Sequence, residues 1–140
     1  MVIKNSTPCE KRNDRAESRM DMRHYFVNFT NHPSAGWEEH QIQEALKYGE
    51  ILDLPFPTVD PQGDEDYIRR LSEECAGQIL TLCPGAVLCQ GEFNLVHQVV
   101  NQLLEQGVTV LAACSARMVE EADGKKVVTY QFCRFRKYER

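Results

Sequence analysis

Residues 86–89 read Ala-Val-Leu-Cys, and this short segment without a polar side chain constrains the fold more than any other. It follows Pro84-Gly85, which breaks the preceding helical pattern, and it ends at Gln90-Gly91-Glu92. A wholly apolar strand of this length is typical of a strand that is buried on both faces. The chain must therefore supply cover for two sides of the sheet that contains it.

Strand patterns and helix patterns alternate along the chain. Aromatic and β-branched residues predict the first strand, and a short apolar run predicts the third. The strands are expected over residues 25–29, 50–54, 86–89 and 108–113. A hairpin is expected after them, with strands over 118–121 and 127–135 and the type I′ turn pair Asp123-Gly124 between them.

Three helices are expected between the first four strands. The first has Ser34 as its N-cap and runs to about residue 48, where Gly49 ends it. The second is capped by Asp60 or Asp64 and carries apolar residues at helical spacing as far as residue 82. The third is capped by Asn94 and ends at Gly107.

This order of elements predicts the fold class. Strands that alternate with helices form a parallel sheet with right-handed crossovers. We therefore expect an α/β protein with a three-layer, Rossmann-like, mostly parallel sheet and a C-terminal antiparallel hairpin.

Length and composition predict one domain and exclude some functions. The chain has 140 residues, of which residues 1–21 have almost no large apolar side chains and are expected to be a disordered extension of a domain over 22–140. The formal net charge of −5 argues against duplex DNA as a partner. The sequence contains neither a signal peptide nor an apolar run near the roughly 20 residues of a membrane span, so a cytoplasmic protein is expected.

Polar residues gather at three of the four predicted strand ends, and ligands bind at the carboxyl ends of parallel strands. They indicate one site that combines an imidazole, hydroxyls, amides, a carboxylate and a guanidinium. We expect catalytic roles for His32, Glu92 and Arg117. We expect ligand-binding roles for Thr30, Asn31, Ser34, Gln90, Gly91, Asn94 and Ser115.

Structural roles for the same residues stay open. His32 could serve only to hydrogen-bond its loop, and Glu92 could be an acidic residue that stabilises a helix N-terminus. Arg117 could be a solvated charge, and Trp37 could pack against the sheet or stack on a base. Glycine-rich phosphate motifs and metal-ligand spacings are missing from the sequence, so no metal and no cofactor are expected.

Several spaced motifs resemble those of a known family. They are the run from Val87 to Phe93, the run from Ala112 to Arg117, and the C-terminal Phe-Arg-Lys-Tyr-Glu. This pattern is similar to the small CRISPR-associated accessory proteins of the Csx group. The resemblance covers the C-terminal half of the chain well and residues 22–57 more loosely.

The resemblance implies a CARF-like domain of the ring-nuclease type. Such a domain would form a two-fold homodimer, bind a cyclic oligoadenylate second messenger and cleave it without a metal, in antiviral defence. Of the expected site residues, Gln90, Gly91, Glu92, Ser115 and Arg117 match the family pattern. One alternative is a sensor or sponge that binds the messenger without cleaving it. A second, independent alternative is a small-molecule enzyme with Cys114 as its nucleophile.

Overall fold

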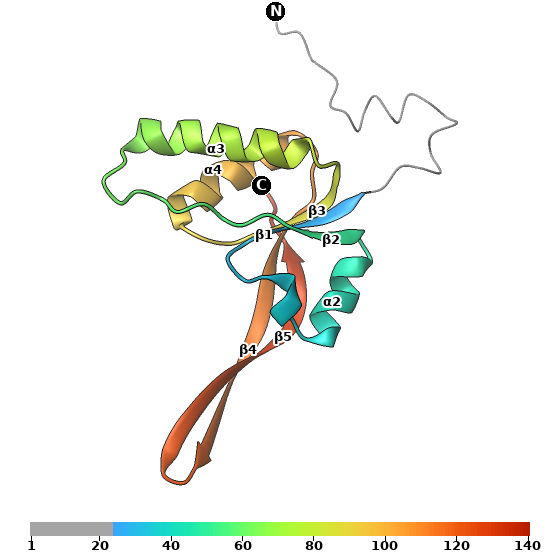
Figure 1. The fold of residues 1–140 in the computed structure, drawn as a ribbon, viewed down its shortest axis with the longest axis vertical. Helices are drawn as coiled ribbons and strands as arrows, with labels where there is room; N and C mark the ends of the chain where they lie inside the picture. The colour runs from blue at the N-terminus through green and yellow to red at the C-terminus, as the bar shows by residue number, and fades with distance from the viewer. Residues whose placement is uncertain (1–23) are drawn as a thin grey trace, which may run out of the picture.

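The computed structural model describes residues 24–140, and within them the strands form one curved sheet with the order β2-β1-β3-β4-β5 (Figure 1). The first four strands are parallel, and β5 is antiparallel to β4. Their bounds are β1 Tyr25–Phe29, β2 Glu50–Asp53, β3 Pro84–Cys89, β4 Val110–Ala122 and β5 Lys125–Lys137. The predicted α/β class, the mostly parallel sheet and the antiparallel C-terminal pair are confirmed. The expected extension over residues 1–21 lies outside the described residues.

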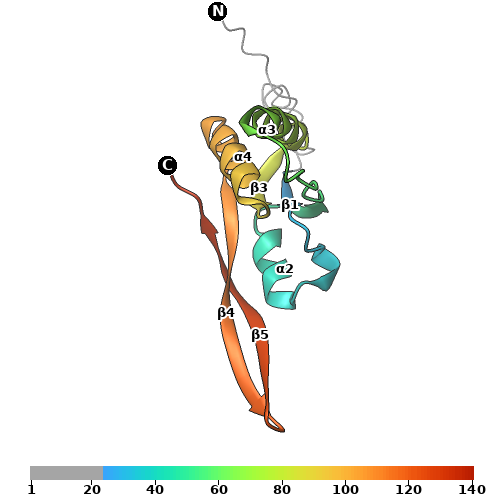
Figure 2. The same ribbon diagram turned by 90° about the vertical axis from the view of Figure 1, so that its left-hand side faces the viewer.

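The helices lie on both faces of the sheet. The helices α3 (Glu65–Leu80) and α4 (Phe93–Glu105) pack on one face, and α2 (Glu39–Leu46) packs on the other (Figures 1 and 2). Each face has its own apolar cluster, and β3 contributes to both: Val87 and Cys89 face α3 and α4, whereas Ala86 and Leu88 face α2. The strand over 86–89 is thus buried on both faces, as its composition predicts.

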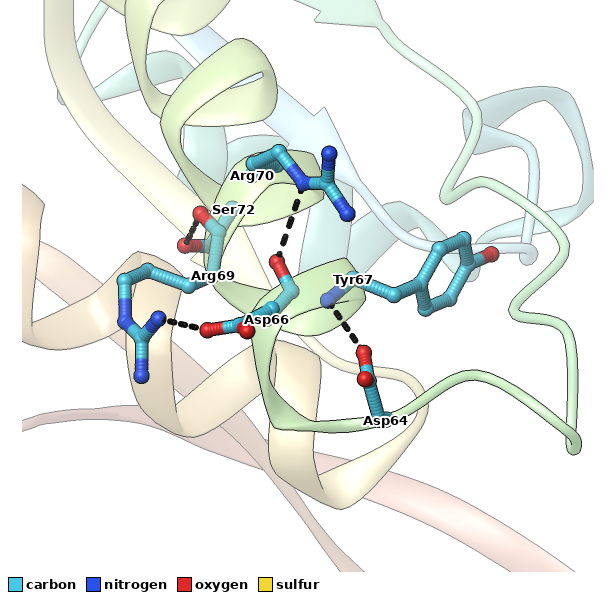
Figure 3. Close-up of polar contacts among 6 residues, drawn as sticks. All are labelled: Asp64, Asp66, Tyr67, Arg69, Arg70 and Ser72. Carbon is cyan, nitrogen blue, oxygen red and sulfur yellow. Dashed lines mark hydrogen bonds and ion pairs between the residues drawn. The ribbon is translucent and has the colours of Figure 1, made fainter.

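Helix α3 begins as one of the two alternatives predicts. The carboxylate of Asp64 is the N-cap and accepts a hydrogen bond of 2.9 Å from the backbone N–H of Tyr67 (Figure 3). Within the first turn, Asp66 forms an ion pair with Arg69, and the hydroxyl of Ser72 donates to the Arg69 carbonyl at 2.7 Å. These local contacts fix the start of the helix, and the Ser72 hydroxyl also joins it to α4 because it accepts a hydrogen bond of 2.7 Å from the Gln102 side chain.

The caps of the other two helices were predicted wrongly. Ser34 begins a short 3-10 turn, η2 (Ser34–Gly36), and α2 starts only after Glu38. The hydroxyl of Ser34 is not available as a cap because it donates to Asp53 at 3.1 Å. Helix α4 begins two residues earlier than predicted, with Glu92 as its N-cap in place of Asn94.

The largest difference from the predicted fold lies in β4. The expected fourth parallel strand and the expected first hairpin strand are one continuous strand of 13 residues. Polar residues at Ser115 and Arg117 interrupt the apolar pattern, but pairing with β5 keeps the backbone extended through both. The turn at Asp123-Gly124 is confirmed, and both residues have the positive φ, 52° and 73°, that a type I′ turn requires.

The far half of the β4–β5 hairpin projects beyond the body of the protein (Figures 1 and 2). Strand β3 pairs with β4 only at Val110 and Leu111, and from Ser115 to Ala122 every residue of β4 is exposed. Within residues 24–140, no helix is both long and apolar enough to cross a membrane.

Candidate functional site

A pocket of about 550 Å³ opens where β1 and β3 end, on the face of the sheet that carries α2. One wall comes from the loop after β1 and the start of α2, and the opposite wall comes from the hairpin. The floor comes from β3 and its end. The lining residues are Thr30, His32, Gly36, Trp37, Glu38, Gln41, Leu88, Gln90, Ala113, Ser115, Tyr130 and Phe132.

Four of the expected site residues line this pocket together. Thr30 and His32 follow β1, Gln90 follows β3, and Ser115 lies in β4. They come from three separate parts of the sequence, so the fold of the sheet brings them together. The carboxyl ends of neighbouring parallel strands therefore do meet at a cavity, as expected for an open α/β sheet.

The loop that carries His32 is held by two polar side chains in the sheet. Asn28, which is buried in β1, donates one hydrogen bond to the His32 carbonyl and one to Asp53 Oδ1, both of 2.9 Å. The Asp53 carboxylate in turn accepts from the backbone N–H of Ser34, at 3.3 Å and 3.2 Å for its two oxygens. The backbone of the loop is thus fixed at His32 and at Ser34.

The Thr30 hydroxyl belongs to the same network. It donates to Asn28 Oδ1 at 2.8 Å and accepts from the backbone N–H of His32 at 3.0 Å. Both directions of this hydroxyl are therefore used within the protein. Thr30 therefore shapes the pocket, and His32 is the histidine that this loop contributes to the lining.

Trp37 packs against the sheet, which is one of the two roles that the sequence left open, and it also lines the pocket. Its ring packs edge-on against Phe26 in the apolar cluster, with 6.0 Å between ring centroids and an interplanar angle of 89°. Its indole N–H donates to the His32 carbonyl at 3.1 Å. The ring is only partly buried and also lines the pocket, so it offers a fixed aromatic surface to a ligand.

Gln90 extends the sheet with its side chain. Its Oε1 accepts a hydrogen bond of 2.8 Å from the backbone N–H of Ala113, just beyond the last residue of β4 that pairs with β3. This contact joins the floor of the pocket to the hairpin wall. The Gln90 amide nitrogen is the part of the side chain that remains for a ligand.

Glu92, Gly91 and Asn94 have structural contacts away from the pocket. The Glu92 carboxylate accepts from the backbone N–H of Leu95 at 2.8 Å and of Asn94 at 3.1 Å, and these bonds lower the pKa of Glu92. A side chain at Gly91 would meet the Phe56 ring at 2.5 Å. Asn94 lies in the first turn of α4, where its side-chain amide donates to Glu92 at 3.1 Å.

The remaining expected residues also lie outside the lining. Asn31 is exposed in the loop, and Ser34 is bound to Asp53. Arg117 lies on the exposed part of β4, opposite Tyr130 in the register. Cys114 alternates with Ala113 and Ser115 along β4, so its side chain points to the opposite face of the hairpin from the pocket.

Three polar side chains of the pocket were missed by the sequence analysis. Tyr130 comes from β5, and Glu38 and Gln41 come from the start of α2. Tyr130 precedes Phe132 by two residues, so the two share a face of β5, whereas Gln41 lies in the first turn of α2 and Trp37 lies before that helix. Strand periodicity could have suggested Tyr130, but only the hairpin register places it beside Ser115 and Phe132.

The comparison with protein families identifies the chain. A model described as "Uncharacterized protein MJ1673 family" matches residues 24–136. The chain belongs to this family. The match covers both walls and the floor of the pocket, and the family description names no ligand and no activity. No curated protein and no solved structure matches the chain.

Proposed function

We propose that the protein binds a cyclic oligoadenylate in this pocket. The observation that carries the proposal is the convergence of Thr30, His32, Gln90 and Ser115 on one cavity that is also lined by the aromatic residues Trp37, Tyr130 and Phe132. Trp37 on one wall and Tyr130 on the other offer surfaces on which an adenine base can stack. His32, Gln90 and Ser115 supply hydrogen-bonding groups for the base edge and the ribose.

The proposal includes the Rossmann-like, three-layer arrangement that the resemblance to CARF domains implies. Helices against both faces of the sheet support it, since α2 packs on one face and α3 and α4 on the other. The strand order β2-β1-β3-β4 supports it as well, because β1 and β3 are neighbours whose crossovers leave in opposite directions. Doubly wound sheets bind ligands at the point where the strand order reverses, and the pocket opens there.

The first reaction to test is metal-independent cleavage of the ring. The ribose 2′-oxygen would form a bond to the adjacent phosphorus while the bond from phosphorus to the leaving 5′-oxygen breaks. The products are a 2′,3′-cyclic phosphate and a 5′-hydroxyl, and the 2′-hydroxyl proton is lost as the 5′-oxygen gains one. His32 is the pocket imidazole that could transfer these protons.

Binding without cleavage is the second candidate function, and a specific observation favours it. Of the three residues expected to act in catalysis, only His32 lines the pocket, because Glu92 caps α4 and Arg117 lies further along the hairpin. The cationic group expected to stabilise charge on the phosphate is therefore outside the lining. A sensor or sponge needs no such group.

The single tryptophan of the chain lines the pocket, so binding can be followed by its fluorescence. We expect cyclic tetra-adenylate or cyclic hexa-adenylate, with EDTA present, to change the emission of Trp37 in a saturable way. Tyr130→Ala should weaken binding, since base–aromatic stacking contributes about 1–3 kcal/mol per base. Phe93→Ala is the matched control because Phe93 is 90% exposed at the start of α4, outside the pocket.

Calorimetric titration with cyclic tetra-adenylate and cyclic hexa-adenylate decides whether the proposed ligand is correct. If neither ring binds, or if Tyr130→Ala and Phe93→Ala bind both rings as the parent does, the proposal is wrong. Chromatography of the bound ring separates the two candidate functions. Cleavage that His32→Ala slows by roughly 10²–10⁴-fold, with binding retained, indicates the ring nuclease. An intact ring with the parent protein indicates the sensor or sponge.

A further inference from the structure

The outer half of β4 has a free edge. Strand β3 pairs with β4 only at Val110 and Leu111. The next backbone N–H of β4 on the β3 side, that of Ala113, donates to the Gln90 side chain. From Ser115 onward, β4 pairs on one side with β5, and the described residues 24–140 supply no strand on the other side. A free strand edge offers a row of backbone donors and acceptors to another strand.

The Ala113 contact defines which residues face this edge. Backbone N–H and C=O groups of alternate residues point to the same side of a strand, and the Ala113 N–H points toward β3. The backbone groups of Ser115, Arg117, Val119 and Glu121 therefore also point to the free edge. The hairpin contains a bulge, because Cys133 of β5 has no partner between the pairs Cys114–Arg134 and Ser115–Phe132. The extra residue is in β5, so the alternation along β4 continues without interruption.

The two edges of the hairpin differ in how they are protected. The outer edge of β5 carries Lys125, Lys126, Arg134, Arg136 and Lys137, and such charges discourage pairing with another strand. The free part of β4 has no lysine and no proline; its charged residues, Arg117, Glu120 and Glu121, are of both signs, and it exposes Met118 and Val119. A two-stranded hairpin alone is marginally stable in water, so this projecting hairpin would gain stability from a further strand.

The charge pattern of the free edge is complementary to that of a second, antiparallel copy of the same edge. Arg117 and Glu121 lie two residues before and two residues after Val119, on the same face of the strand. If two β4 strands run antiparallel with Val119 opposite its own copy, each Arg117 lies opposite a Glu121. If the two strands are instead centred one residue to either side of Val119, Arg117 no longer lies opposite Glu121. Centring the strands on Glu120 places that carboxylate opposite its own copy, which opposes two like charges.

We propose that two copies of the chain associate through this edge, with antiparallel β4 strands that join the two hairpins into a four-stranded sheet around Val119. Val119 forms a hydrogen-bonded pair with the partner's Val119, flanked on each side by an Arg117–Glu121 ion pair. The proposal does not depend on the ligand of the pocket. It rests on the free edge, the exposed apolar residues and the charge pattern of β4.

Sedimentation equilibrium of the full chain over a range of concentrations tests the proposal. We expect a dimer for the parent and a monomer for Val119→Lys, because a lysine at the centre of the edge opposes its own copy. Val127→Lys is the matched control: Val127 is 48% exposed and Val119 is 47% exposed, but Val127 lies on β5. The control should dimerise like the parent, and circular dichroism should report the same fold for all three proteins.

A charge exchange tests the register independently. Arg117→Glu or Glu121→Arg alone places like charges opposite each other and should raise the dimer dissociation constant roughly tenfold. The double variant Arg117→Glu/Glu121→Arg restores two opposite-charge pairs and should dimerise like the parent. A parent that is monomeric, a dimer that Val119→Lys leaves intact, or a control that dissociates equally would overturn the proposed interface. If the double variant dissociates as readily as the single ones, the register is wrong.

Discussion

The side-chain amide of Asn28 in β1 donates a hydrogen bond of 2.9 Å to Asp53 Oδ1 at the end of β2, directly across the parallel pair. Asn28 is 1% exposed, so this amide is a polar group within the core of the sheet. Its second donor reaches the His32 carbonyl, and Asp53 also binds Ser34. One buried amide therefore couples the pairing of two strands to the conformation of the pocket loop.

We expect Asn28→Ala to destabilise the protein by about 1–3 kcal/mol, since it leaves buried hydrogen-bonding groups without partners. The free energy of unfolding in urea measures this change. The matched control is Asn101→Ala, because Asn101 is exposed on α4 and its side chain contacts only the His97 ring. An equal loss of stability in the two variants would mean that the Asn28 network contributes nothing specific.

The parts of the fold that depend on local pattern were predicted from the sequence. The strand over 86–89 was correct because four apolar residues can be satisfied only by burial on both faces. Asp64, one of the two N-caps predicted for the second helix, is correct because an acidic side chain precedes a clear helical stripe. The Asp123-Gly124 turn followed from two residues that adopt positive φ readily.

The errors come from contacts between distant residues. Ser34 has the chemistry of an N-cap, but Asp53, which is 19 residues away, binds its hydroxyl. Ser115 and Arg117 seemed to mark the end of a strand, and only the pairing with β5 keeps them in one. Because the pocket uses both β5 and the loop after β1, sequence patterns could suggest Thr30, His32, Gln90 and Ser115 but could not place Tyr130 among them.

Gly91 is expected to tolerate no side chain without a loss of stability. A Cβ at this position would meet three atoms of the Phe56 ring at 2.5–2.6 Å, and Phe56 is buried against Phe29. Gly91→Ala should therefore cost about 1–3 kcal/mol, the usual range for overpacking. Chemical denaturation measures the change, and Gly36→Ala serves as the control because nothing lies within 4 Å of a Cβ there.

The thiols of Cys89 and Cys133 should react at very different rates. Burial raises the pKa of Cys89 to about 12, whereas Cys133 is exposed on β5. Since the thiolate is the reactive form, a maleimide at neutral pH should label Cys133 first, the half-buried Cys114 more slowly and Cys89 last. Mass spectrometry of the labelled peptides gives the order, and denaturant should abolish it. Rapid native labelling of Cys89 would contradict its position in the core.

The stability that Glu92 gives to α4 should disappear in acid. Hydrogen bonds from the backbone N–H groups of Leu95 and Asn94 lower the pKa of Glu92 below the ordinary carboxyl value of 4.5. A carboxyl whose pKa is lower in the folded than in the unfolded state contributes stability above the unfolded value. It loses that contribution as the pH falls through the folded value. We therefore expect Glu92→Gln to be less stable than the parent at pH 7 and the difference between them to be smaller at about pH 3, because a larger fraction of the Glu92 carboxyl is protonated there. Urea denaturation at the two pH values measures the difference. Glu73→Gln on the exposed face of α3 tests whether the loss of any one negative charge is enough to lower the stability at pH 7.

Because the Glu92 carboxylate is bonded to the helix and lies outside the pocket lining, Glu92→Gln should also leave ligand binding unchanged. A binding defect at pH 7 in a variant that is fully folded would instead place Glu92 in the site.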